Sequence, residues 1–174
     1  MSLKKPKDIP KISRPREKKI DKIKDHTPHK KKSEIEFNCN IYFKTKTASD
    51  VQYYCIEVET VQYFSFLSYE LSLQFKKKKN VVYISIIGLK AKNNYVNEPS
   101  PAVTELLFED LYGKYTINIL KQDGSINSAV FDINVFKKEI IILETFLPEK
   151  ENNRQFCSFN VQQNKFSFIN KGIR

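Results

Sequence analysis

From residue 34 onward, apolar and polar residues alternate along the chain, and this period of two restricts what the chain can fold into. In "SEIEFNCNIYF", residues 33–43, apolar side chains recur at every second position. Successive side chains of a strand point to opposite faces of a sheet, so the pattern predicts a half-buried strand. The residues expected to point inward are Ile35, Phe37, Cys39, Ile41 and Phe43, and those expected to point outward are Glu34, Glu36, Asn38, Asn40 and Tyr42.

No segment shows the sustained period of 3.6 residues that a packed helix needs. Further strands are expected at residues 51–59, 61–67, 69–75, 81–87, 103–109, 114–120, 126–136, 139–146, 155–161 and 165–169. Asp123-Gly124 predicts a hairpin, because both residues tolerate positive φ, and "VQQNKFSF" predicts a second one. About 9–11 short strands predict an all-β fold, either an antiparallel sandwich of immunoglobulin-like or jelly-roll type or a barrel.

"DLYGKYTINI", residues 110–119, resembles the tyrosine-corner region of immunoglobulin-like sandwiches. In that family an acidic residue and Gly-x-Tyr precede an inward-facing strand, and here Gly113 and Tyr115 take the last two of these positions. Asp110 lies one residue too far from Gly113, and Ile117 stands where antibody domains have cysteine. The resemblance implies an immunoglobulin-like sandwich and carries no function.

The first 33 residues, called the leader below, differ in composition from the rest. They contain four prolines and neither glycine nor an aromatic residue. Their 13 lysines and arginines face only four acids, a net charge of +9, so the other 141 residues carry only +1 of the chain's +10. We expect residues 1–33 to form an extended basic tail, disordered alone and ordered on a partner. Residues 34–174 are expected to form a single β-domain.

The leader predicts binding to phosphate. Lysines and arginines that neutralise phosphates release condensed counterions, and an extended proline-broken chain fits between nucleic-acid helices. Without aromatic residues the leader has nothing to stack on bases, so contacts with phosphate and ribose are expected. A lysine run between two predicted strands, residues 76–79, is a weaker candidate, because such runs are most often solvated loops. The predicted nucleic-acid-binding residues are Lys4, Lys5, Lys7, Lys11, Arg14, Arg16, Lys18, Lys19, Lys22, Lys24, Lys30, Lys31, Lys32, Lys76, Lys77, Lys78 and Lys79.

The sequence offers few groups for catalysis or metal binding. The only histidines, His26 and His29, lie in the leader, and there is no glycine-rich phosphate loop or G-x-S-x-G motif. Cys39, Cys55 and Cys157 each fall in a strand pattern and are expected to be reduced core thiols. The sequence therefore predicts no enzyme, no metal or cofactor, and no small-molecule substrate.

Other polar and aromatic residues are expected to belong to the solvated surface. Glu57 and Glu59 alternate on one strand and Glu109 and Asp110 are adjacent, which is common on solvated strand faces. Exposed aromatic residues that could contact a partner are expected at Tyr42, Tyr63 and Tyr95.

These features favour a non-catalytic RNA-binding protein, associated with the ribosome or another ribonucleoprotein as a structural component or a factor. Its leader would thread into rRNA while the β-domain docks on the surface of the assembly. The expected partners are RNA, above all rRNA, and neighbouring proteins of that large assembly. One alternative is a small viral capsid protein, whose layout of a basic genome-binding arm on a jelly roll this chain resembles. Another is an immunoglobulin-like protein-interaction module, and a ligand-holding barrel is supported by strand number alone. The lack of a membrane-length apolar run and of a signal peptide predicts a cytoplasmic protein without a membrane partner.

Overall fold

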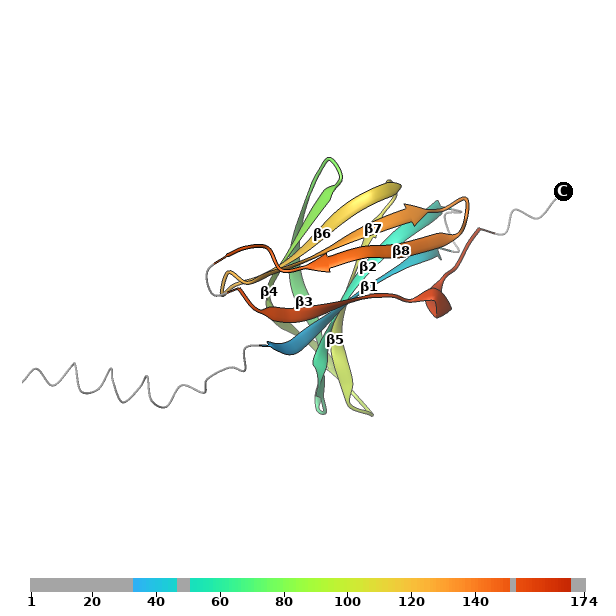
Figure 1. Ribbon diagram of the computed structural model, residues 1–174. Coiled ribbons are helices and arrows are strands. Elements are labelled where there is room, and N and C mark those ends of the chain that lie inside the picture. The colour runs from blue at the N-terminus through green and yellow to red at the C-terminus, as the bar shows by residue number, and fades with distance from the viewer. Residues whose placement is uncertain (1–32, 47–50, 151–152, 170–174) are drawn as a thin grey trace, which may run out of the picture. The chain divides into compact units, whose positions relative to one another are not determined.

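The structure is a computed structural model that describes residues 33–46, 51–150 and 153–169 (Figure 1). These belong to one unit, residues 32–174. The predicted RNA-binding residues of the leader lie outside the described residues, so its predicted conformation and contacts stay predictions. In the part of the chain that the structure describes, no helix has the length and apolarity needed to span a membrane.

The described residues confirm the all-β prediction. The strands are β1 (Ser33–Lys46), β2 (Val51–Phe64), β3 (Leu67–Lys78), β4 (Val81–Tyr95), β5 (Ser100–Phe108), β6 (Gly113–Lys121), β7 (Ile126–Asn134), β8 (Glu139–Phe146) and β9 (Gln155–Val161). A short 3-10 turn, η1 (Gln163–Lys165), follows β9.

The strands form two sheets, so the predicted barrel is wrong. Sheet A has the order β5-β2-β1-β9 and sheet B the order β3-β4-β6-β7-β8. The prediction of purely antiparallel sheets is also wrong, because β1 pairs with β9 and β4 with β6 in parallel. The chain leaves sheet B after β4, forms β5 in sheet A, and returns as β6. It has then reversed direction twice, so β6 runs the same way as β4.

The two sheets pack their inner faces together as a sandwich-like core. Sheet A contributes the predicted inward residues of β1, of which Cys39, Ile41 and Phe43 are fully buried. Sheet B contributes Ile84 and Phe131, which are also fully buried. The β3–β4 hairpin projects at one end of the molecule, and the β2–β3 and β4–β5 connections lie at the other (Figure 1).

Side chains join the two sheets on both sides of the core. On one side the Thr104 hydroxyl of β5 donates to the Leu71 carbonyl of β3 at 2.7 Å and accepts from its N–H at 2.9 Å. On the other side the Asn127 carboxamide of β7 accepts from the N–H groups of Phe156 (2.8 Å) and Cys157 (2.7 Å) of β9. Asn127 also donates to the Arg154 carbonyl at 2.8 Å. Both side chains thus satisfy buried backbone groups that no strand ladder reaches.

One predicted turn is confirmed, whereas two predicted strands and a second hairpin differ from the structure. The Asp123-Gly124 hairpin between β6 and β7 is confirmed, with Gly124 at φ +83° and its N–H donating to the Lys121 carbonyl at 2.9 Å. Residues 61–67 are not a separate strand, because β2 continues through a bulge to Phe64. The predicted strand 165–169 and its hairpin are wrong. Instead the chain continues along β1, and the Ser167 N–H donates to the Phe43 carbonyl at 2.9 Å.

The tyrosine-corner resemblance holds locally. The Tyr115 hydroxyl donates to the Asp110 carbonyl five residues upstream at 3.0 Å, Gly113 has φ +80°, and Ile117 is fully buried. The resemblance to the immunoglobulin fold does not extend beyond this corner. The sheets of that fold are antiparallel, whereas β4 and β6 pair in parallel.

Candidate nucleic-acid interface

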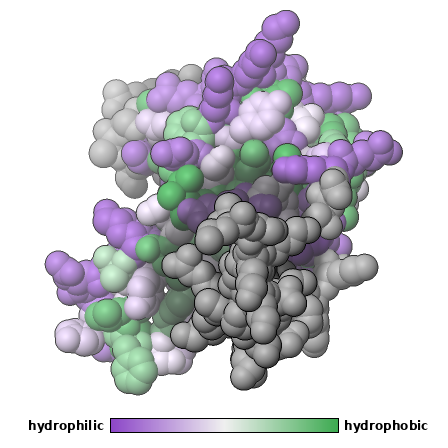
Figure 2. Space-filling view, turned by 90° about the vertical axis from the view of Figure 1, so that its left-hand side faces the viewer, coloured by the Kyte–Doolittle hydropathy of each residue, from purple (hydrophilic) through white to green (hydrophobic). Residues whose placement is uncertain are grey.

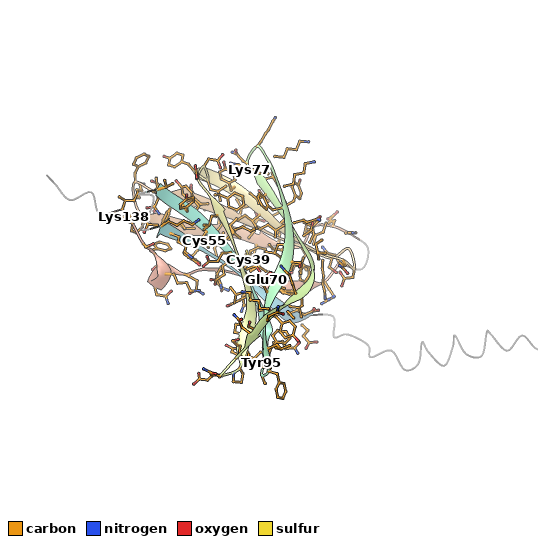
Figure 3. The ribbon with its side chains drawn as sticks, turned by 180° about the vertical axis from the view of Figure 1, so that it is seen from behind. Cys39, Cys55, Glu70, Lys77, Tyr95 and Lys138 are labelled. Atoms are coloured by element: carbon orange, nitrogen blue, oxygen red, sulfur yellow. The ribbon has the colours of Figure 1, made fainter. Side chains whose placement is uncertain are left out.

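The predicted lysine run lies at the tip of the β3–β4 hairpin. Lys76, Lys77 and Lys78 end β3, and Lys79 begins the turn in the left-handed region, at φ 52°. Hydrophilic side chains project at the top of the molecule in Figure 2, the height of this hairpin tip in Figure 1. Lys77 is labelled there in Figure 3, at the opposite end from Tyr95.

The hairpin separates its lysines into two groups. Lys77 turns inward, where its Nζ lies 2.5 Å from an Asp110 carboxylate oxygen and 5.3 Å from the centre of the Tyr115 ring. Burial lowers the pKa of Lys77, but the hydrogen bond to Asp110 and the electrostatic influence of Tyr115 outweigh burial and raise it. Lys76, Lys78 and Lys79 are exposed, and among the described residues none of them has an ion-pair partner. Lys77 thus holds the hairpin on the body, while the other three face solvent.

Several other lysines of the body are neutralised by carboxylates. Lys90 and Lys92 both pair with Glu70, at 3.0 and 3.6 Å. Lys44 pairs with Glu105 at 2.5 Å. The exposed ammonium groups at the hairpin tip therefore remain available to an external anion, whereas those of Lys44, Lys90 and Lys92 are already paired.

The outer face of sheet A contains a polar network, which corrects two predictions. Tyr42 and Glu57 were expected to be solvated, but only 3% of Tyr42 and 4% of Glu57 is exposed. The Tyr42 hydroxyl lies 2.7 Å from a Glu105 oxygen and 3.0 Å from a Glu57 oxygen, and its single proton is shared between these two acceptors. The Lys165 ammonium, which η1 brings back over this face, donates to Glu57 at 2.8 Å and lies 5.3 Å from the Tyr42 ring centre.

This network has the character of a structural site. Burial raises the pKa of Glu105, but hydrogen bonds from Lys44 and Tyr42 outweigh burial and hold it below the usual range. The Asn40 amide donates to both Glu57 and Glu59 at 3.1 Å. Each of the three carboxylates, Glu57, Glu59 and Glu105, accepts hydrogen bonds from neighbouring side chains of this face.

A second charged cluster joins β1 to the β6–β7 hairpin. Glu36 of β1 accepts hydrogen bonds from Lys121 and from the Arg154 guanidinium, the latter at 2.6 Å. Arg154 also contacts Asp123 at 3.2 Å. The cluster links the two sheets at the end of the molecule where β1 begins.

Asp123 leads to a prediction about pH. Burial alone would raise its pKa, but the Ser125 N–H, the Arg154 guanidinium and Lys121 lower it to about 2. Because the folded pKa lies below the unfolded value, the carboxylate stabilises the fold at pH values above about 4. This contribution is lost as the pH falls through 2. We expect a carbon-13 NMR titration of Asp123 to have a midpoint near 2, and Arg154→Gln to raise it. An unchanged midpoint in Arg154→Gln would contradict the assignment.

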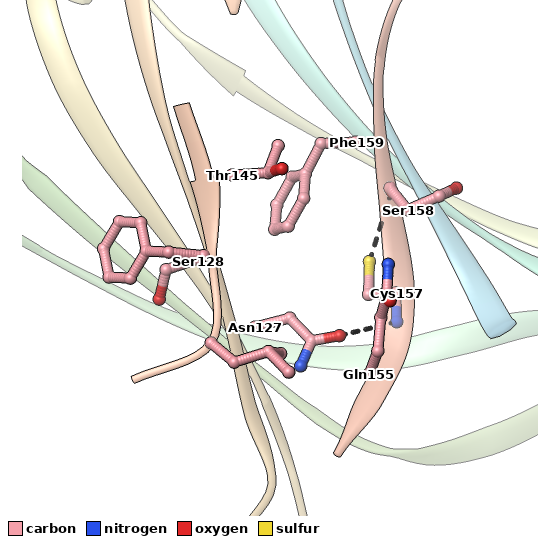
Figure 4. A pocket seen from close by; sticks show the side chains of 9 residues that line it. Asn127, Ser128, Thr145, Gln155, Cys157, Ser158 and Phe159 are labelled. Carbon is pink, nitrogen blue, oxygen red and sulfur yellow. Dashed lines mark hydrogen bonds between the residues drawn. The ribbon is translucent and has the colours of Figure 1, made fainter. Parts of the chain in front are cut away.

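A pocket of about 350 Å³ opens between β7, β8 and β9 (Figure 4). Its lining includes Asn127, Thr145, Cys157 and Phe159. The Asn127 carboxamide is occupied by the β9 backbone, and burial raises the pKa of the Cys157 thiol to about 12, which keeps it protonated. The three cysteines are buried and unpaired, as predicted. Among the described residues, no three or more His, Cys, Asp or Glu side chains gather to hold a metal ion.

No protein-family model, curated protein or solved structure matches this chain. Its function is therefore inferred from the chain's own charges and geometry.

Proposed function

We propose that this protein is a non-catalytic RNA-binding protein of the ribosome or another ribonucleoprotein, either a structural component or a factor. The leader supplies the main contacts with phosphate, and the β3–β4 hairpin supplies a second contact. The observation that carries the proposal is the separation of charge along the chain. The leader has a net charge of +9, whereas the 141 residues after it have +1.

The body supports the proposal at the hairpin tip. Lys76, Lys78 and Lys79 are exposed and, within the described residues, lack ion pairs. An exposed ammonium without a protein carboxylate can neutralise a phosphate without first breaking an ion pair. The hairpin is also fixed in position, because Lys77 binds Asp110 and lies over Tyr115.

Binding of the full chain to RNA across a salt series tests the proposal. We expect the logarithm of the association constant to fall linearly with the logarithm of the salt concentration, with a slope steeper than about −4. Heparin should compete, and ribonuclease should release the protein from cellular assemblies. Binding to such assemblies that resists both salt and ribonuclease would overturn the proposal in favour of a protein-interaction module. Assembly of the chain alone into shells would favour a capsid protein instead.

A further inference from the structure

The outer face of sheet B exposes an aromatic ring beside the hairpin lysines. In β4, Val82 and Ile84 are fully buried in the core, so Tyr83 between them points to the opposite face. Its side chain is 40% exposed there. The sequence alone does not single out Tyr83, because an isolated tyrosine in a strand pattern shows nothing of its neighbours.

The strand register places a cation and an amide on either side of this ring. Lys76 of β3 lies directly opposite Tyr83, and Asn118 of β6 lies opposite it on the other side. Residues directly opposite each other in neighbouring strands share a face of the sheet. Lys78, opposite Val81, therefore lies on the same face, two register pairs closer to the hairpin tip.

Asn118 borders this surface with most of its side chain buried, since only 8% of the residue is exposed. Its carboxamide oxygen accepts from the Ser128 hydroxyl at 2.6 Å, which fixes the oxygen toward β7. Its NH₂ group has no partner among the described residues. The exposed ring is therefore flanked by ammonium groups on the β3 side and by a largely buried amide on the β6 side.

We propose that this part of sheet B, around Tyr83, binds an unpaired RNA strand. Tyr83 stacks on one base, while Lys76 and Lys78 neutralise the neighbouring phosphates. The proposal rests on the proposed function and deepens it. A stacked duplex buries the faces of its bases, so only an unpaired strand can present one to the ring.

The distribution of charge restricts the proposed RNA strand to the part of sheet B that β3, β4 and β6 form. Three acidic residues of this face, Asp132, Glu139 and Glu144, lie on β7 and β8, and Asp132 is opposite Lys114. The register also places Glu70 of β3 on this face, but its carboxylate is paired with Lys90 and Lys92. A phosphate backbone is repelled from the half that β7 and β8 form and attracted to the half that ends at the lysine tip. Exposed aromatic residues at the other end of the molecule lack this arrangement. Tyr95, for example, is 85% exposed, but the lysines Lys90 and Lys92 of the same strand are paired with Glu70.

The absence of tryptophan from the chain gives a direct test of stacking. In the full chain, Tyr83→Trp places the only tryptophan at the proposed site, where its fluorescence can be excited selectively. We expect single-stranded oligouridylate to quench its fluorescence, and an RNA duplex of equal phosphate concentration to leave it unchanged. Tyr95→Trp, at the far end of β4, is the matched control and should not respond to either RNA.

Affinity measurements complete the test. Tyr83→Ser should weaken single-strand binding about five- to hundred-fold, the usual effect of losing one stacked base, while Tyr83→Phe keeps the affinity. The salt dependence should not change in either variant. Lys76→Gln with Lys78→Gln should instead make the salt slope shallower by about 1.5.

Two different failures can be distinguished. If the full chain shows no salt-dependent binding to RNA, the proposed function fails. If the chain instead binds RNA with a steep salt slope, but the fluorescence of Tyr83→Trp does not respond and Tyr83→Ser keeps full affinity, only the stacking site on sheet B is overturned.

Discussion

Deletion of the leader is expected to remove most of the salt dependence of RNA binding. A protein that contacts 6–10 phosphates loses about 10³–10⁵ in affinity between 50 and 200 mM salt, and the leader has enough cations for this. The remaining body has three free hairpin lysines, so residues 34–174 should lose less than about 50-fold over the same range. Filter binding or fluorescence anisotropy at several salt concentrations measures both slopes.

Neutralising lysines of the leader without shortening the chain distinguishes the effect of the leader's charge from the effect of its length. Replacing Lys18, Lys19, Lys22 and Lys24 by Gln should make the slope shallower by about 3, and Lys90→Gln with Lys92→Gln serves as the control. These control lysines are already paired with Glu70, so we expect a change of less than about 1. Equal slopes for the full chain and the deletion variant would show that the leader does not contact phosphate.

Asn127→Ala is expected to cause the largest loss of stability among the single substitutions considered. Only 2% of Asn127 is exposed, and its carboxamide satisfies two N–H groups and one carbonyl of the β9 region. A buried backbone group left without a partner costs about 1–3 kcal/mol. We therefore expect the free energy of unfolding in urea to fall by about 3 kcal/mol or more, with a decrease of several degrees or more in the melting temperature.

Asn134→Ala is the matched control for this loss. Asn134 accepts one hydrogen bond, from the N–H of Lys137 in the exposed β7–β8 turn, at 3.0 Å. Water can replace this contact, so the expected loss is below about 1 kcal/mol. Similar losses in the two variants would mean that Asn127 does not join β7 to β9 as its geometry indicates.

The features that the sequence could predict are those that depend on neighbouring residues. Alternation identified the strand at β1 and its inward residues, and Asp123-Gly124 identified the β6–β7 turn. The lysine run between two strand patterns predicted the hairpin tip. In each case the signal lies within about ten residues, where turn chemistry and side-chain alternation act directly.

The features that the sequence could not predict depend on which distant strands become neighbours in the sheets. Alternation assigned Tyr42 to the outer face correctly, but its burial depends on Glu105 and Lys165, which lie 63 and 123 positions further along the chain. Tyr83 meets Lys76 through the β3–β4 register, which contains a bulge at Ser72/Leu73. A one-residue shift would have placed a different side chain beside the ring. The parallel β4–β6 pair likewise follows from the path of β5 through the other sheet.

The position of β1 within sheet A has a mechanical consequence. β1 lies between β2 and β9, with hydrogen bonds to both neighbours along much of its length. Tension applied to the polypeptide ahead of β1 is directed along this central strand, so it loads the bonds on both sides in shear together. Rupture then requires many bonds to break at once instead of one after another. The fold is therefore expected to resist a force applied at the N-terminal end of β1.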